Sequence, residues 1–394
     1  MSGNLRDRLR RIQRMQEGRG EPVPPRYDEP KPPVSVTLPG WDSAGYLTLR
    51  REIIGGKAMI FPAMPETAGM VMPGLGGGSL YEDLLFFDLE TTGLSGGAGT
   101  MAFLAAFGRL VLDTARTNKK TYTYNLHITQ YLLLDYPGEY DFVTAMLGEF
   151  KHNSIIVSYN GKSFDSQILK TRCLMNGIVP PEYRHADLLH PARRLWKTLL
   201  PDCCQASIET AILGIDRTGD IPGAMAPEIW FSFLRDGETD ALRGICEHNR
   251  RDIAGLAAIF HAMIRIAHDP LGAAKKINFD LEALALRWNE MPLLHHAAEM
   301  GYPRAELHYA IALRREAEYD ESRKWLLKAA AENRPPAIRS AGLRVLAMDS
   351  ERRLKNIAEA LTFAEQGMEL LPPDSSRRQE FESRIQRLKK HALP

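Results

Sequence analysis

Residues 84–100 read L-L-F-F-D-L-E-T-T-G-L-S-G-G-A-G-T, an apolar run followed by two carboxylates and a glycine-rich turn. The apolar run predicts a buried strand over 84–90. Because side chains alternate across a strand, Asp88 and Glu90 point to the same face. Two neighbouring carboxylates repel each other unless a cation lies between them, and Mg²⁺ and Mn²⁺ prefer oxygen ligands. The stretch therefore predicts a metal site at the end of a core strand.

The sequence around this stretch predicts a sheet with helices beside it. Hydrophobic patterns predict three further strands and three helices. The strands cover 101–111, 121–131 and 154–159, and the helices cover 137–150, 163–175 and 240–267. The order resembles the ribonuclease H-like fold, so the predicted class is α/β, with a mixed sheet and flanking helices.

Two more motifs carry carboxylates on suitable elements. In S-Y-N-G-K-S-F-D, Asp165 begins a helix just after a strand ends. In E-H-N-R-R-D, His248 and Asp252 are four residues apart and share one face of a helix. Each motif alone has a plainer interpretation, as turn and capping chemistry or as a surface pair. Occurring in this order after Asp88 and Glu90, they favour a single shared site.

Residues 80–270 resemble the DEDD exonuclease superfamily and, more closely, the YprB-like ribonuclease H-like domain. The resemblance covers nearly half of the chain. It depends on the three motifs quoted above and on H-A-D-L-L-H-P-A-R-R-L-W, which begins at His185. The glycine-rich extension of the first motif is its most specific part.

This resemblance implies phosphodiester hydrolysis with two divalent cations, Mg²⁺ or Mn²⁺. By analogy, Asp88, Glu90, Asp165 and Asp252 are the metal ligands, and His248 orients or deprotonates the attacking water. In the superfamily a histidine usually lies five residues before the last aspartate, or a tyrosine four before. Here a histidine lies four before, so His248 is either the general base or a partner of Asp252.

The same resemblance implies contacts with a nucleic-acid substrate. Thr92 and Leu94 would meet the terminal nucleotide, and Asn160 would hydrogen-bond the sugar-phosphate backbone. Lys162 would meet a phosphate. Leu94 as a core residue and Lys162 as a solvent-facing turn lysine are the plainer alternatives.

A basic segment over 184–197 admits two interpretations. Its arginines and lysine beside Trp196 suit single-strand binding by phosphate contact and stacking. A solvated helix face with Trp196 buried is slightly favoured. Asp187 in the same segment is a candidate to assist the metal site, although the four superfamily ligands are already assigned.

The remaining segments differ in composition. Residues 1–40 predict a basic, proline-rich flexible segment, and 41–80 a flexible approach to a nuclease domain over 81–270. Residues 280–394 predict an all-α region. Two segments there, from Ser322 and from Ala360, carry small residues at offsets that resemble the second helix of tetratricopeptide repeats. An unrelated helical bundle is the alternative.

The amino-acid composition says more about the cellular location of the protein than about its function. The net charge of +1 neither supports nor excludes nucleic-acid binding. The four cysteines show no disulfide framework, which predicts a reducing, cytoplasmic location. Apolar runs are too short for a membrane span, and the N-terminus lacks the apolar core of a signal peptide.

Two functions compete at this point. The first is a metal-dependent nuclease, a 3′–5′ exonuclease that acts on single strands or 3′ ends of DNA or RNA. The second is a nucleic-acid-binding or scaffold protein that recruits a protein partner through its helical tail, because helical repeats generally present binding surfaces.

Overall fold

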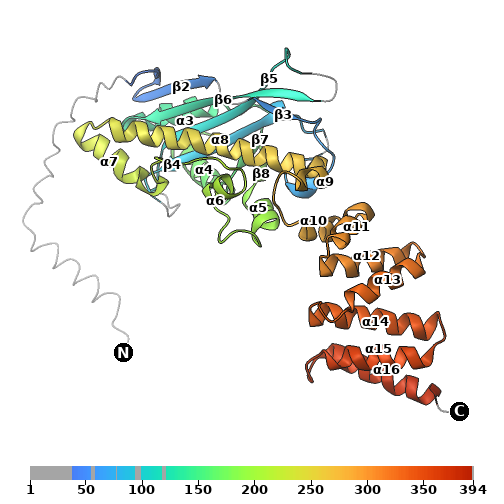
Figure 1. The fold of residues 1–394 in the computed structure, drawn as a ribbon. Helices are drawn as coiled ribbons and strands as arrows, with labels where there is room; N and C mark the ends of the chain where they lie inside the picture. The colour runs from blue at the N-terminus through green and yellow to red at the C-terminus, as the bar shows by residue number, and fades with distance from the viewer. Residues whose placement is uncertain (1–37, 55–57, 77, 94–98, 118–120, 393–394) are drawn as a thin grey trace, which may run out of the picture. The chain divides into compact units, whose positions relative to one another are not determined.

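The computed structural model describes residues 38–54, 58–76, 78–93, 99–117 and 121–392. The predicted basic segment up to residue 37, and Leu94, therefore lie outside the described residues. Within them, a mixed sheet is followed by a long series of helices (Figure 1). This confirms the predicted fold class.

An eight-stranded sheet forms the first part, with the strand order β1-β2-β6-β5-β4-β7-β8 and β3 also paired with β6. Strands β2, β6, β5 and β4 are antiparallel neighbours, whereas β4, β7 and β8 run parallel. The parallel strands bring their carboxyl ends to one edge of the sheet. The strands are β1 (Asp42–Gly45), β2 (Thr48–Ile54), β3 (Met59–Phe61), β4 (Leu84–Thr91), β5 (Ala102–Leu112), β6 (Tyr122–Leu133), β7 (Ile155–Ser158) and β8 (Arg184–Asp187).

The interpretation of residues 41–80 as a flexible approach is wrong. Strand β2 pairs with β6 over its whole length, from Thr48 opposite Leu133 to Ile54 opposite His127, and β3 also pairs with β6. Charged residues and glycines in and around these short strands interrupt the alternating pattern of apolar and polar residues. The sequence pattern therefore did not predict strands there. Antiparallel pairing with β6 supplies the backbone partners that make them strands.

Helices cover both faces of this sheet. Helix α8 lies along one face and contacts β3, β4, β5 and β6, while α3 contacts β1, β2 and β6 (Figure 1). On the α8 face, Phe86 packs edge-on against Phe260 with ring centroids 5.5 Å apart. The helices of this part are α2 (Ala68–Val71), α3 (Glu139–Leu147), α4 (Asp165–Met175), α5 (Leu189–Trp196), α6 (Gln205–Ala211), α7 (Ala226–Asp236), α8 (Asp240–His268) and α9 (Pro270–Ala274).

Consecutive helices in the tail pack against one another. Small residues at the predicted offsets, Ser322 and Ala329 in α13 and Ala360 and Ala364 in α15, are fully buried, so neighbouring helices approach closely. The resemblance to tetratricopeptide repeats stays a prediction. The helices are α10 (Leu281–Trp288), α11 (Met291–Glu299), α12 (Pro303–Arg315), α13 (Tyr319–Ala329), α14 (Pro336–Arg352), α15 (Ile357–Glu369) and α16 (Ser376–Ala392).

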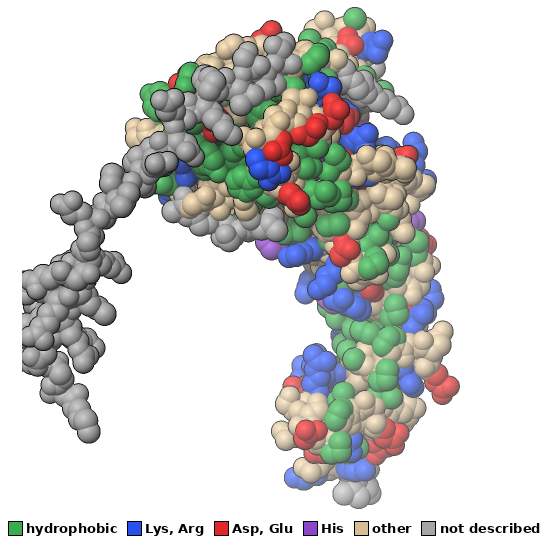
Figure 2. All heavy atoms as spheres, turned by 90° about the vertical axis from the view of Figure 1, so that its left-hand side faces the viewer, with side chains coloured by type: hydrophobic (Ala, Val, Ile, Leu, Met, Phe, Trp, Pro, Cys, Tyr) green, Lys and Arg blue, Asp and Glu red, His purple; other side chains and the backbone are tan. Residues whose placement is uncertain are grey.

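The described surface mixes charges of both signs. On the face drawn in Figure 2, Lys and Arg side chains are interspersed with Asp and Glu, with hydrophobic side chains between them. This pattern agrees with the near-neutral net charge. In the part of the chain that the structure describes, every helix is too short or too polar to cross a membrane.

Candidate active site

Strand β4 carries the first two carboxylates to the carboxyl edge of the sheet. Asp88 and Glu90 alternate with Leu89 and share the face of Phe86, which is covered by α8. Glu90 is 8% exposed. The apolar strand that predicts the fold thus also holds both carboxylates in place, with Glu90 buried and Asp88 partly exposed.

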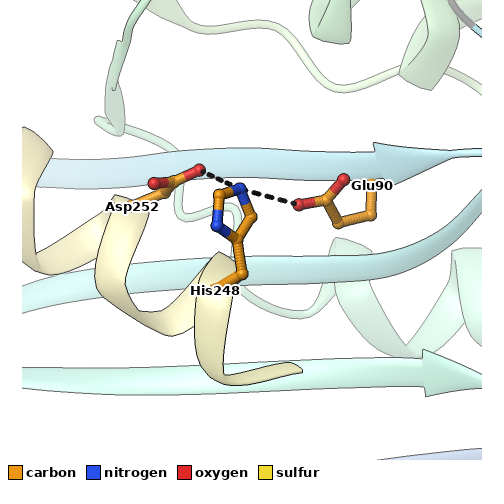
Figure 3. A group of neighbouring side chains, drawn as sticks. All are labelled: Glu90, His248 and Asp252. Carbon is orange, nitrogen blue, oxygen red and sulfur yellow. Dashed lines mark ion pairs between the residues drawn. The ribbon is translucent and has the colours of Figure 1, made fainter. Parts of the chain in front are cut away.

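Helix α8 brings a histidine and an aspartate to the same place. His248 and Asp252 lie one turn apart and face Glu90 across the gap between helix and strand (Figure 3). The Nε2 atom of His248 lies 3.3 Å from Asp252 Oδ2 and 3.9 Å from Glu90 Oε1. Ligand atoms of these three residues lie within 4.8 Å of one another, a spacing that suits a shared metal ion.

Asp165 approaches the site from the end of β7. It is the first residue of α4 and is 7% exposed. The turn before it contains Gly161, where an added Cβ would lie 2.6 Å from Ser158 Oγ and 2.9 Å from Asp165 Oδ2. A glycine is therefore required for Asp165 to lie this close to the end of the strand.

Burial and mutual repulsion disfavour ionised carboxylates here. Burial, followed by the charges of Asp252 and Asp165, raises the pKa of Asp88 and of Glu90 well above the usual range. Burial also raises the pKa of Asp165 to about 7. Among the described residues, no lysine or arginine pairs with Asp88, Glu90 or Asp165. A divalent cation would relieve this repulsion, and the oxygen-rich donor set fits Mg²⁺ or Mn²⁺.

Asn249 holds Asp88, a role that the sequence did not suggest. Its side-chain amide donates to Asp88 Oδ2 at 2.7 Å, and its Oδ1 accepts from Gln130 Nε2 at 2.8 Å. Arg51 Nε in turn donates to Gln130 Oε1 at 2.7 Å. Asn249 and Gln130 are fully buried, so both are fixed by these hydrogen bonds. Asn249 lies inside the third motif. Gln130 and Arg51 belong to no motif, so a single sequence gives no signal for their role.

A second group of unpredicted residues surrounds Asp252. The guanidinium of Arg217 contacts Asp252, lies 3.1 Å from Glu209 Oε2 and donates from Nε to Asp220 Oδ2 at 2.9 Å. That Asp220 oxygen is also 3.0 Å from His248 Nδ1, although the angle is not that of a hydrogen bond. The nearby Gly223 leaves room for the imidazole, because an added Cβ would lie 2.9 Å from His248 Nε2.

Asp187 supports a turn next to Asp165, and its charge contributes to the raised pKa of that residue. Its Oδ1 accepts from the backbone N–H groups of Asn160 and Leu189, and its Oδ2 accepts from that of Lys162. Asn160 has a left-handed φ of 64°. These bonds fix the turn in which Asn160 and Lys162 expose their side chains beside the site.

The other predicted substrate contacts differ in their placement. Thr92 Oγ1 accepts from Met101 N at 3.0 Å, so its hydroxyl already closes the base of a loop. Trp196 is fully buried and donates to Asn278 O at 2.9 Å. Stacking of a base on Trp196 is therefore excluded, and the interpretation of 184–197 as a solvated face over a buried Trp196 is correct.

Comparisons with known proteins agree with this fold. Residues 85–264 match a family model described as the RNase_H superfamily. The protein YprB of Bacillus subtilis (strain 168), described as uncharacterized, is 38% identical over 181 residues, which cover 45% of this chain and 41% of YprB. The chain thus spans less than half of the length of this relative.

A solved structure described as exonuclease I in complex with the inhibitor BCBP aligns at 11% sequence identity. The alignment covers 73% of this chain and 99% of that chain, with a TM-score of 0.26. A similarity this low supports no conclusion on fold or activity. The sheet topology is that of an RNase H-like fold, and residues 85–264 are similar to the RNase_H superfamily model and to part of YprB.

Proposed function

We propose that this protein is a divalent-metal-dependent nuclease, a 3′–5′ exonuclease that hydrolyses phosphodiester bonds of DNA or RNA. The observation that carries the proposal is the convergence of Glu90, His248 and Asp252, whose ligand atoms lie within 4.8 Å of one another, with Asp88 and Asp165 close enough for their charges to interact with Glu90. They come from three segments far apart in the sequence. Such a cluster costs stability in a protein without a cation, which a purely structural role does not explain.

Two cations held by these carboxylates would supply an activated water and stabilise the leaving oxygen. The protein's own residues then have separate tasks. Asn249 fixes one oxygen of Asp88, which leaves the other directed to the site. Arg217 and Gln205 hold Asp252, through its carboxylate and its backbone carbonyl respectively.

His248 is placed to handle a proton or to hold a ligand. Its Nε2 lies between Asp252 and Glu90 (Figure 3). A neutral imidazole there would accept a proton from the attacking water. Its position four residues before Asp252 equally suits an outer partner of that ligand, so a variant of His248 distinguishes the two roles.

Substrate binding is proposed to use the turn after β7 and the loop after β4. Asn160 and Lys162 expose their side chains beside Asp165 and would contact the sugar-phosphate backbone. Thr92 would meet the terminal nucleotide through its hydroxyl proton, because its Oγ1 only accepts from Met101 N, whereas its backbone N–H already donates to Met101 O. Leu94 stays a proposed base contact.

The test is hydrolysis of single-stranded DNA and RNA, each labelled at the 5′ or the 3′ end, with Mg²⁺, Mn²⁺ or chelator. Asp252→Asn is compared with Asp240→Asn, because Asp240 lies on the same helix and is 85% exposed. Stepwise shortening from the 3′ end, lost with chelator and in Asp252→Asn but kept in Asp240→Asn, is the expected result.

Absence of cleavage by the folded wild-type protein with either metal would reject the nuclease. The protein would then be assigned as a nucleic-acid-binding or scaffold protein, with its partner on the tail α10–α16. Shortening from the 5′ end or internal cuts would retain the nuclease and reject the proposed polarity. The variant His248→Gln distinguishes the two roles of His248. If His248 is the general base, hydrolysis stays low even at saturating metal. If His248 is a partner of Asp252, a higher metal concentration restores hydrolysis.

A further inference from the structure

A pocket lies close to the carboxylates, between α4 and β8. It has a volume of about 260 Å³, and its lining includes Lys162, Lys170, Ser166, Tyr183 and His185. This is slightly below the ~300–1,000 Å³ of sites for small molecules, so the pocket suits one nucleotide unit better than a duplex.

The charged side chains that line this pocket are lysines. No acidic residue is among the described residues that line it, and no carboxylate pairs with the ammonium groups of Lys162 or Lys170 in the described part of the chain. A larger cavity at the end of α8, lined by Lys275 and Lys276, contains Asp269 as well. The pocket beside α4 is therefore the better candidate for an anion.

The walls of the pocket are held by internal hydrogen bonds. His185 lies between two hydroxyls, with Nε2 at 2.7 Å from Ser158 Oγ and Nδ1 at 3.3 Å from Ser166 Oγ. Burial lowers the pKa of His185 to about 4, so the ring is neutral and the positive charge comes from the lysines. Asp187 fixes the backbone of Lys162 through its amide N–H.

The pocket shares helix α4 with the carboxylate site. Asp165 and Ser166 are consecutive residues of α4, and Lys170 follows Asp165 by about 7.5 Å along the helix axis. Phosphates of one strand in a duplex are spaced by about 3.4 Å along the axis. A strand with its reacting phosphate at Asp165 would pass Lys162 and reach Lys170 within a few nucleotides.

We propose that this pocket binds an internal backbone phosphate of the substrate strand, through Lys162 and Lys170, with the nucleoside against Tyr183. The inference rests on the proposed function, because it assigns a further contact of the same substrate. The chemistry is that of single-strand binding generally, in which cations meet phosphates and an aromatic ring meets a base.

The test measures binding in chelator, where hydrolysis does not interfere. Anisotropy of labelled single-stranded DNA and RNA with hydroxyl ends gives Kd over a range of salt concentrations for Lys170→Ala, Lys162→Ala and Lys170→Arg. Lys151→Ala is the matched control, because Lys151 is exposed near the amino end of β7, the opposite end of the same strand.

We expect Kd to rise several-fold in both alanine variants, and the slope of log K against log salt to fall by about 0.7 for one lost phosphate contact. Lys170→Arg should bind as the wild type does, and Lys151→Ala should leave both quantities unchanged. Melting temperatures of all variants establish that they are folded.

Three results would overturn the assignment. Lysine variants that bind like Lys151→Ala would show that no phosphate occupies the pocket. A dependence on Lys170 that appears only with 5′- or 3′-phosphorylated strands would replace the internal phosphate by a terminal one. Tight binding of inorganic phosphate that fails to compete with the strand would indicate a separate anion site. Lysine-dependent binding without any metal-dependent hydrolysis would reject the proposed nuclease and keep the pocket.

Discussion

Two buried groups of charges, one in the sheet domain and one in the helical tail, show opposite electrostatics. In the tail, the Asp349 side chain is fully buried and lies 2.8 Å from Arg314, 3.1 Å from Arg353 and 3.7 Å from Arg323. Burial would raise the pKa of Asp349, but hydrogen bonds from Arg353 and Arg314 lower it. The tail therefore neutralises its buried carboxylate with its own arginines.

The sheet domain leaves its buried carboxylates largely without such partners. Asp88 has a neutral amide donor in Asn249, and its pKa is raised by burial and by other carboxylates. Arg217 contacts Asp252 at the margin of the cluster. The comparison teaches that burial alone does not identify a functional carboxylate. An uncompensated cluster indicates a site for a cation, whereas a compensated one stabilises the fold.

The largest expected effect is on hydrolysis by Asp88→Asn. Loss of one ligand removes several kcal/mol of charge stabilisation, which corresponds to about 10³-fold in rate. Because the change also removes a repelling charge, we expect the melting temperature in chelator to rise. A variant with lowered melting temperature and lowered activity together would instead place Asp88 among structural groups such as Asp349.

The next effect is on stability, from Asp349→Ala. Removal of the buried carboxylate takes away the shared partner of three partly exposed arginines, and the loss of its charged hydrogen bonds should lower the free energy of unfolding of the tail by about 1.5–3 kcal/mol. Urea denaturation followed by circular dichroism measures the change. Asp320→Ala is the control, because Asp320 is 94% exposed, lies 3.6 Å from the same Arg353 and should change stability by less than about 1 kcal/mol. Equal losses in both variants would contradict the comparison.

A smaller effect is expected from Asn249→Ala, which removes the donor to Asp88 but keeps all four carboxylates. Loss of a hydrogen bond behind a metal ligand typically costs about 10–100-fold in metal affinity. Titration of Mn²⁺ by electron paramagnetic resonance measures this affinity. Arg250→Ala is the control on the same helix, because Arg250 pairs with Glu247, away from Asp88. Unchanged Mn²⁺ affinity in Asn249→Ala would exclude this support.

The smallest effect is a pH dependence of stability in chelator. The pKa of Asp165 is raised to about 7 in the folded protein, above its value of 3.8 when unfolded, so folding favours the protonated carboxyl. This stability is fully present below pH ~4 and is lost as the pH rises to about 7. Asp165 thus lowers the melting temperature from pH 5 to 8, and Mn²⁺ should restore it. A fall in melting temperature that is as large in Asp165→Asn as in the wild type would assign the effect to Asp88 and Glu90, whose pKa values are raised as well.

The sequence by itself determined the strands and helices with the strongest patterns. The run over 84–90 became β4, and the predicted helix over 240–267 became α8. These elements carry their hydrophobic pattern locally, so a single sequence suffices. The same motifs also named Asp88, Glu90, Asp165, His248 and Asp252 as candidates, because two carboxylates follow an apolar run and the other two motifs occur after them in the order that the resemblance implies.

The tertiary structure decided what lies around those residues. Pairing with β6 made strands of β2 and β3, and it placed Arg51 behind Gln130 and Asn249. Arg217 reached Asp252 from a loop 35 residues away in sequence. Such contacts depend on partners distant along the chain. The sequence of a strand or of a loop arginine does not show which group will lie opposite to it after folding, so these contacts could not be predicted from a single sequence.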